Sequence, residues 1–295
     1  MKCMQEFDYT GKAMGTDLAI AIVTKSAEVA DPISEKIISE IQANEARFSR
    51  FLTDSELSRL NEQREMKVSG AFIEVASQAR ELFEKTHGAF NPLFQISRFG
   101  YGKSFSEIES EKNTATEPEE KYNTNFSSTI IDTQNSKIIL QEGQKIDFGG
   151  FLKGYLAEKL CKEIISDENV RGAIVNIGGD LHARGLDENG RKFIFNVHNP
   201  VTDNESIEIP LFNQSLATSG TYKRKWGPNE SPRNHILGIS GKENPNSDII
   251  SASVIHNSGG VSEAIAKTLI SIGPDETQKL FEEELKFIII KKTDK

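Results

Sequence analysis

The chain has 295 residues, and its 35 Lys and Arg against 44 Asp and Glu give a formal net charge of -9 at pH 7. A chain this acidic has no broad basic surface to neutralise phosphates, which argues against a nucleic-acid-binding protein. Its longest apolar tracts, such as 18–23 and 287–290, have the length of strands, whereas a membrane helix needs about 18 apolar residues or more. We therefore expect a globular protein with a sizeable core, no nucleic-acid partner and no membrane span.

The start of the chain lacks the apolar segment of a secretory signal. This predicts a cytoplasmic protein, or a cell-envelope protein from which a leader has been removed, and the sequence does not separate the two. The two cysteines, Cys3 and Cys161, lie far apart and form neither a disulfide framework nor a CxxC metal site. Cys161 lies within an apolar helical pattern, so we expect it in the core.

The first part of the chain alternates between strand and helix patterns. Residues 13–24 open as a strand, and residues 31–47 carry isoleucines at helical spacing. A second helix is predicted over 72–86 and ends at His87–Gly88. Residues 104–125 contain almost no apolar side chains, so we interpret them as an exposed insertion. A solvated loop is its simplest role, and shaping the access to a cleft is the alternative.

The remainder repeats the arrangement of short strands and helices. The predicted elements are strands over 130–132, 137–140 and 145–148, a helix with Leu156, Leu160, Ile164 and Ile165 on its core face, strands over 173–177 and 249–256, a helix over about 261–272, and a last helix and strand. No fixed-period repeat and no long linker is present in the sequence. We therefore predict one two-lobed α+β domain over residues 5–292.

The stretch Asp147–Tyr155 offers the most chemistry. A strand pattern ends in an acid, two glycines follow, and Lys153 lies one turn into a helix. Glycine lets the backbone approach a ligand, a helix N-terminus offers free N–H groups, and lysine adds a point charge, which together suit a phosphate. A plain glycine turn with a surface lysine is the alternative. Two further glycine turns, 176–180 and 217–222, are weak signals on their own.

Two other features have both a functional and a structural interpretation. His235 follows Asn234 and begins a short apolar run, and a neutral histidine near a phosphate suits a general base; a structural histidine is the alternative. Glu263 and Lys267 lie four residues apart on one helix, where a solvated ion pair is the plain interpretation. The sequence has no HxxxH motif or His/Cys cluster, which argues against zinc.

Taken in order along the chain, several segments resemble the FAD:protein FMN transferases, the ApbE-type flavin transferases. The resemblance runs from about Ala13 to Leu269, and it depends on the joint occurrence of the segments, of which 54–61 is quite specific. The segments are 13–16 (AMGT), 48–51 (FSRF), 54–61 (DSELSRLN), 86–92 (THGAFNP), 99–100 (FG), 147–155 (DFGGFLKGY), 176–180 (NIGGD) and 217–220 (ATSG).

This resemblance implies a two-lobed α+β fold with mixed β-sheets and flanking helices. It further implies an enzyme that takes FAD as substrate, uses Mg²⁺ at the pyrophosphate and transfers FMN to a threonine or serine hydroxyl of an acceptor protein, with release of AMP. Such a transfer needs positioning and charge neutralisation more than covalent catalysis. A lysine, a metal and backbone donors around two phosphates fit that need.

The resemblance also implies roles for the residues that match its motifs. His235 would be the base on the attacking hydroxyl, and the Gly150 carbonyl would be a metal ligand. The residues implied to bind FAD are Met14 at the flavin, Phe51 at the adenine, and Ala89, Phe90, Asn91, Asp147, Lys153, Ser219, Ile236 and Leu237 elsewhere along the cofactor.

The sequence departs from the family pattern at three places. Asn91 stands where an acid is expected, and Leu237–Gly238 stands where Asp-Pro is expected. In the segment that corresponds to the late metal box, Glu263 can still offer a carboxylate to Mg²⁺. Lys267 occupies the position of a threonine ligand, and an ammonium has no lone pair to give a metal.

These departures suggest that the Lys267 ammonium takes the place of the cation at the pyrophosphate, or pairs with Glu263, so that FAD binds without divalent metal and transfer is slow or lost. The alternative is ordinary metal dependence, with Thr268 as a ligand after a local π-bulge or with Lys267 pointing to solvent. The first functional interpretation is a Mg²⁺-assisted FMN transferase. The alternatives are a catalytically reduced homologue that holds FAD, and an FAD pyrophosphate hydrolase that yields FMN and AMP.

Overall fold

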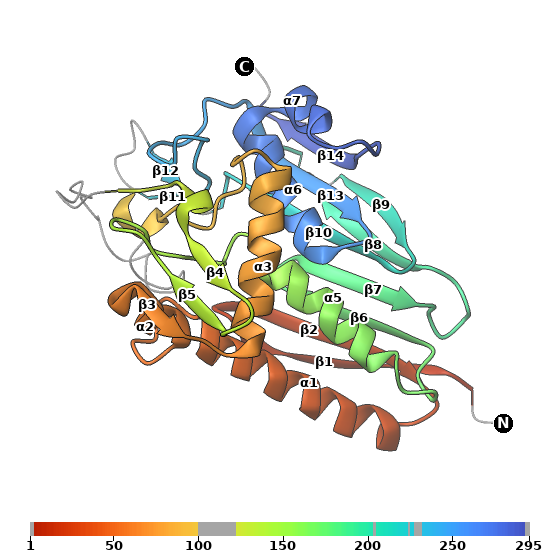
Figure 1. Cartoon of the computed structure of the whole chain (residues 1–295). Helices are drawn as coiled ribbons and strands as arrows, with labels where there is room; N and C mark the ends of the chain where they lie inside the picture. Colours follow the sequence, from red (N-terminus) through yellow and green to blue (C-terminus); the bar gives the residue numbers. More distant parts are fainter. Residues whose placement is uncertain (1–2, 100–121, 203–204, 224, 227–231, 293–295) are drawn as a thin grey trace.

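The computed structural model describes residues 3–99, 122–202, 205–223, 225–226 and 232–292, which form an α+β fold (Figure 1). Most of the predicted insertion 104–125 lies outside the described residues. At its described end, the Tyr122 hydroxyl donates a hydrogen bond to the carbonyl of Gly241, 3.1 Å away, so this end is attached to the rest of the chain. No helix among the described residues has the length and apolar character that crossing a membrane requires.

A seven-stranded sheet with the order β1-β2-β6-β7-β10-β13-β14 forms the centre of the fold. Its strands are β1 (Gln5–Ala13), β2 (Thr16–Thr24), β6 (Gly172–Ile177), β7 (Asp180–Gly185), β10 (Gln214–Gly220), β13 (Ile249–His256) and β14 (Lys286–Lys291). The α+β class predicted from the sequence is confirmed. We expected mixed sheets, but every strand pairing within the described residues is antiparallel.

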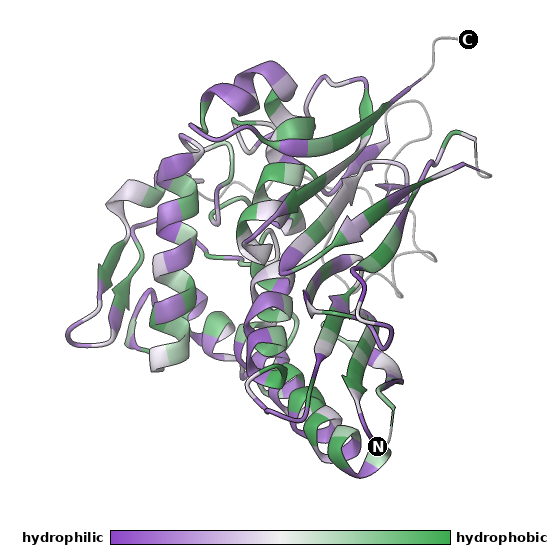
Figure 2. Ribbon diagram, turned by 90° about the vertical axis from the view of Figure 1, so that its right-hand side faces the viewer, coloured by the Kyte–Doolittle hydropathy of each residue, from purple (hydrophilic) through white to green (hydrophobic). Residues whose placement is uncertain are grey.

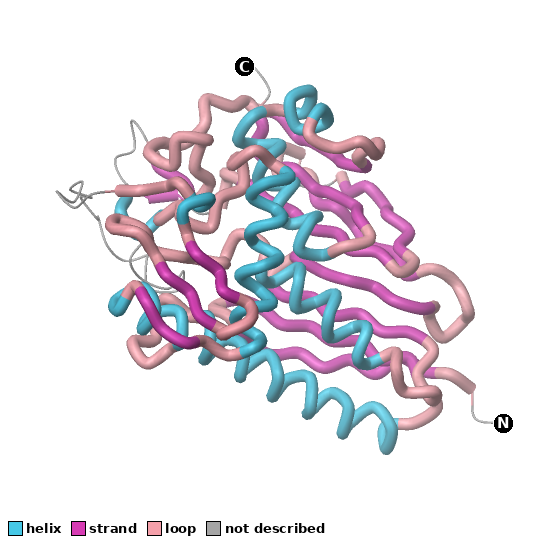
Figure 3. Tube along the Cα trace, in the orientation of Figure 1, coloured by secondary structure: helices cyan, strands magenta, loops and turns pink. Residues whose placement is uncertain are grey.

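The helices gather on one side of this sheet (Figures 1 and 3). They are α1 (Ala27–Phe48), α2 (Glu56–Gln63), α3 (Gly70–Lys85), α5 (Leu152–Ile164), α6 (Gly259–Ile272) and α7 (Pro274–Lys279), with short 3-10 turns at Ile96–Phe99 and Phe126–Ser128. Helix α1 packs on β1 and β2, α5 on β6 and β7, and α6 on β10 and β13. The three helices therefore share one face of the sheet.

Three smaller sheets complete the described part of the fold. Their strands are β3 (Glu65–Lys67), β5 (Lys137–Ile139) and β4 (Ile130–Asp132) in the first, β8 (Phe193–His198) and β9 (Ser206–Leu211) in the second, and β11 (Lys225–Trp226) and β12 (Arg233–Asn234) in the third. The β8–β9 hairpin buries Phe193 and Leu211 against Leu181 and Val23, on the side of the sheet away from the helices. Both faces of the sheet are thus covered.

The sequence pattern explains why these elements form. In β2, Leu18, Ile20 and Ile22 alternate with residues of the other face and join the core beneath α1. In α5, Leu152, Leu156 and further apolar residues recur at helical spacing and are buried. Figure 2 shows the resulting bands of apolar and polar residues along the helices. Each such large apolar side chain stabilises the fold by about 1.5–3 kcal/mol.

The structure confirms most predicted elements and corrects two of them. Residues 145–148 form no strand, because the Asn61 side chain bonds both backbone groups of Ile146, at 2.7 Å from N–H to Oδ1 and 2.9 Å from Nδ2 to the carbonyl. Residues 217–220 are not a turn but part of strand β10, between β7 and β13. The turn predicted at 176–180 is confirmed between β6 and β7, whereas the division into domains stays a prediction.

Two glycines let the N-terminal ends of α5 and α6 meet backbone to backbone. A Cβ built on Gly154 would lie 2.2 Å from the carbonyl oxygen of Gly259, and one built on Gly259 would lie 2.0 Å from the carbonyl oxygen of Gly154. Only glycine permits such an approach. The contact brings Lys153, at the start of α5, beside Glu263, in the second turn of α6.

Candidate active site

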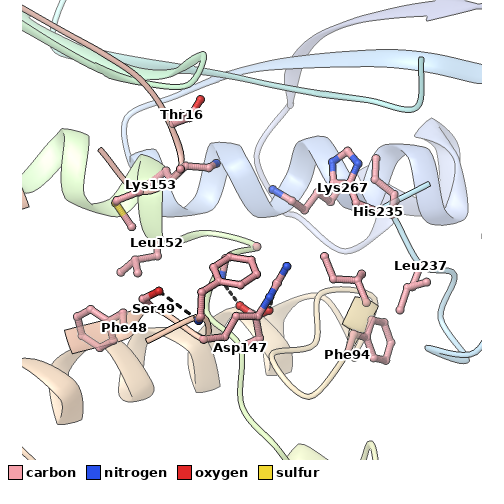
Figure 4. A pocket seen from close by; sticks show the side chains of 18 of the residues that line it. Thr16, Phe48, Ser49, Phe94, Asp147, Leu152, Lys153, His235, Leu237 and Lys267 are labelled. Carbon is pink, nitrogen blue, oxygen red and sulfur yellow. Dashed lines mark hydrogen bonds and ion pairs between the residues drawn. The ribbon is translucent and has the colours of Figure 1, made fainter. Parts of the chain in front are cut away.

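A cavity of about 390 Å³ opens beside the first turn of α5 (Figure 4). Its wall is assembled from the β1–β2 turn, the end of α1, the loop 89–96, the segment 147–153, residues 235–237 and Lys267 of α6. The predicted site residues that line it are Met14, Phe51, Ala89, Phe90, Asn91, Asp147, Gly150, Lys153, His235, Ile236, Leu237 and Lys267. Segments far apart in the sequence therefore meet as the resemblance implied, while the role of each residue stays a prediction.

Two predicted residues do not reach the cavity. Ser219 lies in β10, is 4% exposed and is not part of the wall, because the segment 217–220 is a strand and not a turn. Glu263 is completely buried behind the wall. The plain interpretation of Glu263 and Lys267 as a solvated pair is thus wrong for the carboxylate, although the ion pair itself is present.

Glu263 accepts hydrogen bonds from two lysines of different helices. Its Oε1 lies 2.8 Å from Nζ of Lys153 and 2.9 Å from Nζ of Lys267. Its Oε2 accepts from the backbone N–H of Gly154 at 2.9 Å. Lys153 also donates to the buried carboxylate of Asp180, so two lysines and two acids form one cluster at the cavity wall.

The charges in this cluster follow from burial and pairing. Burial alone would raise the pKa of Glu263, but the ammoniums of Lys153 and Lys267 together with the Gly154 N–H hold it at about 2. Burial and the neighbouring charge of Glu263 raise the pKa of Asp180. The pKa of Lys153 lies above its ordinary value, because the charges of Asp180 and Glu263 outweigh its burial. Glu263 is therefore a carboxylate and Lys153 an ammonium at neutral pH.

The residues at the implied metal position do not fit a divalent cation. N–H donors occupy three of the roughly four acceptor positions that a carboxylate offers. Lys267 has no lone pair, and its Cδ would lie 4.0 Å from a Cβ built on Gly150, so its stem runs beside the implied carbonyl ligand. The described residues hold no group of three or more His, Cys, Asp or Glu side chains able to bind a metal ion.

The alternative ligand Thr268 is also excluded by its position. Its hydroxyl donates to the carbonyl of Ala264, 3.0 Å away, and its side chain is completely buried. Helix α6 continues through this position without a π-bulge. Lys267 points not to solvent but to the cavity wall, where its side chain is 22% exposed.

Asp147, on the opposite wall, makes an ion pair with Arg50, with 2.5 Å between Oδ2 and Nη1. The guanidinium carbon of Arg50 lies 4.6 Å from the ring centroid of Phe51, which is 46% exposed at the mouth of the cavity. Asp147 Oδ1 also accepts from the N–H of Gly149 at 2.8 Å. The guanidinium of Arg50 thus bridges the two residues: it pairs with Asp147 and packs over the ring of Phe51 in a cation–π contact.

The remaining walls are largely apolar. Figure 4 shows Phe48 and Leu152 at one end of the cavity and Phe94 and Leu237 at the other. Phe90 packs edge-on against Phe151, with ring centroids 5.6 Å apart, which fixes its ring in the wall. Such walls suit a flat ring system.

Asn91, which stands in place of an acid, uses its side chain for the loop itself. Its Nδ2 donates to the carbonyl of Thr124 at 2.9 Å, and its Oδ1 accepts from the N–H of Leu93 at 3.0 Å. Asn91 thus holds the loop that carries Ala89 and Phe90 to the cavity.

His235 reaches the cavity from a short connection that side-chain amides hold in shape. The Nδ2 of Asn244 donates to the carbonyls of Asn234 and Ile236, at 2.7 and 2.6 Å, and Asn234 Oδ1 accepts from the Ile236 N–H at 2.9 Å. His235 and Lys267 both line the cavity (Figure 4). A neutral imidazole at the cavity wall can accept a proton from a bound hydroxyl.

Some cavity residues were not predicted from the sequence. They are Gly15, Thr16, Glu45, Phe48, Ser49, Arg50, Leu52, Phe94, Ile96, Gly149 and Leu152. Arg50 had a usable signal, because it stands between two aromatic residues in the segment 48–51. Phe94 and Ile96 had none, because only the folded loop turns them toward the cavity.

Comparisons with known proteins agree with this arrangement. The model of the ApbE family matches residues 14–289. An FAD:protein FMN transferase from Klebsiella pneumoniae (strain 342) is 21% identical over 292 residues, which cover 93% of this chain and 81% of the relative. One from Escherichia coli (strain K12) is 22% identical over 286 residues, which cover 93% and 80%.

Solved structures share the fold. The ApbE protein of Thermotoga maritima superposes with a TM-score of 0.80 at 23% identity, over 97% of this chain and 94% of that chain. The apo form of the flavinyl transferase ApbE of Pseudomonas stutzeri has a TM-score of 0.79 at 17% identity, over 99% and 93%. Because the family model extends over nearly the whole described chain, the protein belongs to the ApbE family.

Proposed function

We propose that this chain is an FAD:protein FMN transferase, which attaches FMN from FAD to a threonine or serine hydroxyl of an acceptor protein and releases AMP. The names of its relatives support this activity. The observation that carries it is the convergence of His235, Lys153 and Lys267 on one cavity with aromatic walls. Transfer of FMN from a dinucleotide needs a base for the attacking hydroxyl and cations at the pyrophosphate. Binding of the dinucleotide needs flat apolar surfaces for its rings.

The cavity fits FAD as a substrate by both size and chemistry. Its volume of about 390 Å³ lies in the range of small-molecule sites, and its open mouth leaves room for part of a long ligand. Apolar side chains at both ends offer surfaces for the two ring systems. The ammoniums of Lys153 and Lys267 lie between these ends, where the two phosphates of an extended dinucleotide would pass.

The reaction we propose is an in-line displacement at phosphorus. The acceptor hydroxyl oxygen attacks the phosphorus on the FMN side of the pyrophosphate, and a phosphoester bond forms. The bond from that phosphorus to the bridging oxygen breaks, and AMP leaves with the bridging oxygen and its electron pair. His235 accepts the proton of the hydroxyl. Lys153 and Lys267 stabilise the charge that develops on the phosphate oxygens.

The test uses the purified chain, FAD and a protein extract of the cells from which the sequence comes. Flavin that survives denaturing electrophoresis reports covalent transfer by its fluorescence, and AMP is quantified in parallel. We expect labelled protein and AMP in equal amounts. Free FMN and AMP without labelled protein would show a hydrolase instead, and bound FAD that is never cleaved would show a binding protein.

A further inference from the structure

The lysine pair has a consequence for how the phosphates of the substrate are neutralised. Lys153 and Lys267 come from different helices, and Figure 4 shows their side chains converging on one region of the cavity wall. Behind them Glu263, completely buried, bonds both. The carboxylate therefore holds the two ammoniums in place and does not face the ligand itself.

Lys267 has hydrogen-bonding capacity to spare. An ammonium offers three N–H donors, and among the described residues Lys267 donates to a single acceptor, Oε1 of Glu263. Lys153 differs, because it donates both to Glu263 and to Asp180. Since Lys267 lines the cavity, its remaining donors are directed at whatever occupies that space.

Lys267 also fills the space where a cation would act. Its stem passes beside Gly150, and its ammonium lies against the buried carboxylate of Glu263. Glu263 gives three acceptor positions to N–H donors, two of them on Oε1, and cannot offer a metal ion a bidentate carboxylate without losing the hydrogen bond from one of the two lysines. A divalent ion entering here would also meet two ammonium charges, which repel it.

We infer that the Lys267 ammonium replaces a divalent cation at the pyrophosphate, so that the chain binds FAD without metal. The inference rests on the proposed function, because it takes FAD to be the ligand. Lysine binds a phosphate as a point charge, and Lys153 and Lys267 together supply the two positive charges that one divalent ion would bring. Their anchoring to Glu263 means that this charge is in position before the substrate arrives.

The first measurement needs no variant. The purified chain is titrated with FAD and followed by flavin fluorescence, once with Mg²⁺ and once with EDTA. We expect the dissociation constants in the two buffers to agree within about twofold, because the ammoniums of Lys153 and Lys267 neutralise the pyrophosphate without the ion. Binding that needs Mg²⁺ would overturn the inference and leave the proposed function standing. No binding of FAD in either buffer would overturn the proposed function, and the inference with it.

Variants at Lys267 then test whether this residue is the cause of metal-independent FAD binding. In EDTA, Lys267→Thr should weaken FAD binding by about tenfold or more, since one charge-assisted hydrogen bond to phosphate is lost. In Mg²⁺ the same variant should recover affinity, because the threonine hydroxyl can face an ion that Glu263 then attracts. Lys267→Met should lose affinity in both buffers. Wild-type affinity of Lys267→Thr in EDTA would overturn the inference.

A matched control is available on helix α7. Lys279 pairs with Glu276 on the same helix, as Lys267 does with Glu263, but its side chain is 68% exposed and lies outside the cavity. Lys279→Thr should bind FAD like the wild type in both buffers. A loss of affinity in this control equal to that of Lys267→Thr would show a general effect of charge and overturn the assignment to Lys267.

Discussion

Asp147 and Arg50 form an ion pair across two segments that the sequence separates widely, with 2.5 Å between Oδ2 and Nη1. Because both side chains are largely buried, we expect Asp147→Ala to lower the free energy of unfolding by about 1–3 kcal/mol. Urea denaturation followed by circular dichroism measures this. The exposed pair of Lys12 and Asp17 is the control, and Asp17→Ala should leave stability unchanged. Equal losses in the two variants would contradict the role of burial.

His235 should matter for the reaction and little for binding. We expect His235→Ala to slow AMP release in the presence of acceptor by about 10²–10⁴-fold, because the attacking hydroxyl loses its base. The dissociation constant for FAD should hardly change. His256→Ala is the matched control, because His256 pairs with Glu283 outside the cavity. Transfer at the wild-type rate by His235→Ala would refute the base assignment.

His182 should make stability depend on pH. Burial lowers its pKa to about 4, whereas an unfolded histidine titrates near 6.5. The unfolded chain therefore binds the proton more tightly, so stability is complete above about pH 6.5 and is lost as the pH falls toward 4. The full loss from this residue is about 3 kcal/mol.

The measurement for His182 is urea denaturation at several pH values from 7 to 4.5. The variant His182→Gln has no group to titrate and should show a shallower fall in stability than the wild type, whatever its stability at pH 7. Its side chain can still bond Ser215, whose Oγ lies 2.7 Å from Nδ1 of the histidine. Identical slopes for the two proteins would rule out the buried histidine as a source of acid sensitivity.

Gly154 should tolerate no side chain. A methyl group there would lie 2.2 Å from the carbonyl oxygen of Gly259, so we expect Gly154→Ala to destabilise the fold by about 3 kcal/mol or more. Thermal unfolding by calorimetry provides the measurement. Gly70→Ala, in the first turn of α3, is the control, because nothing lies within 4 Å of its added Cβ. A neutral Gly154→Ala would mean that the two helices can separate freely.

Local patterns were sufficient to predict much of the fold. Apolar residues at helical spacing, followed by a glycine, predicted helix α3. A run rich in β-branched residues predicted strand β13 with both of its ends. Local patterns gave the wrong secondary structure where tertiary contacts determine it. Residues 217–220 have the composition of a turn, yet they form a central strand, where Ala217 and its small neighbours let α6 pack closely on the sheet.

The site shows the same division. The positions of Lys153 and His235 followed from motif segments, and both line the cavity. The burial of Glu263 could not be predicted, because it results from the crossing of two helices at Gly154 and Gly259. An i, i+4 pair of opposite charges has the same sequence signature whether the acid faces solvent or the core.

The cavity draws its wall from residue 14 near the start to residue 267 near the end of the chain. The complete binding site forms only when both the N-terminal and the C-terminal parts of the chain are folded, because unfolding of either part removes some of the contacts to the ligand. Occupancy and global unfolding are then linked through mass action: each tenfold rise in ligand concentration above the dissociation constant adds about 1.4 kcal/mol to the stability of the whole fold. With FAD as the ligand of the proposed function, the free energy of unfolding would rise with the concentration of FAD, and proteolysis through the unfolded state would slow.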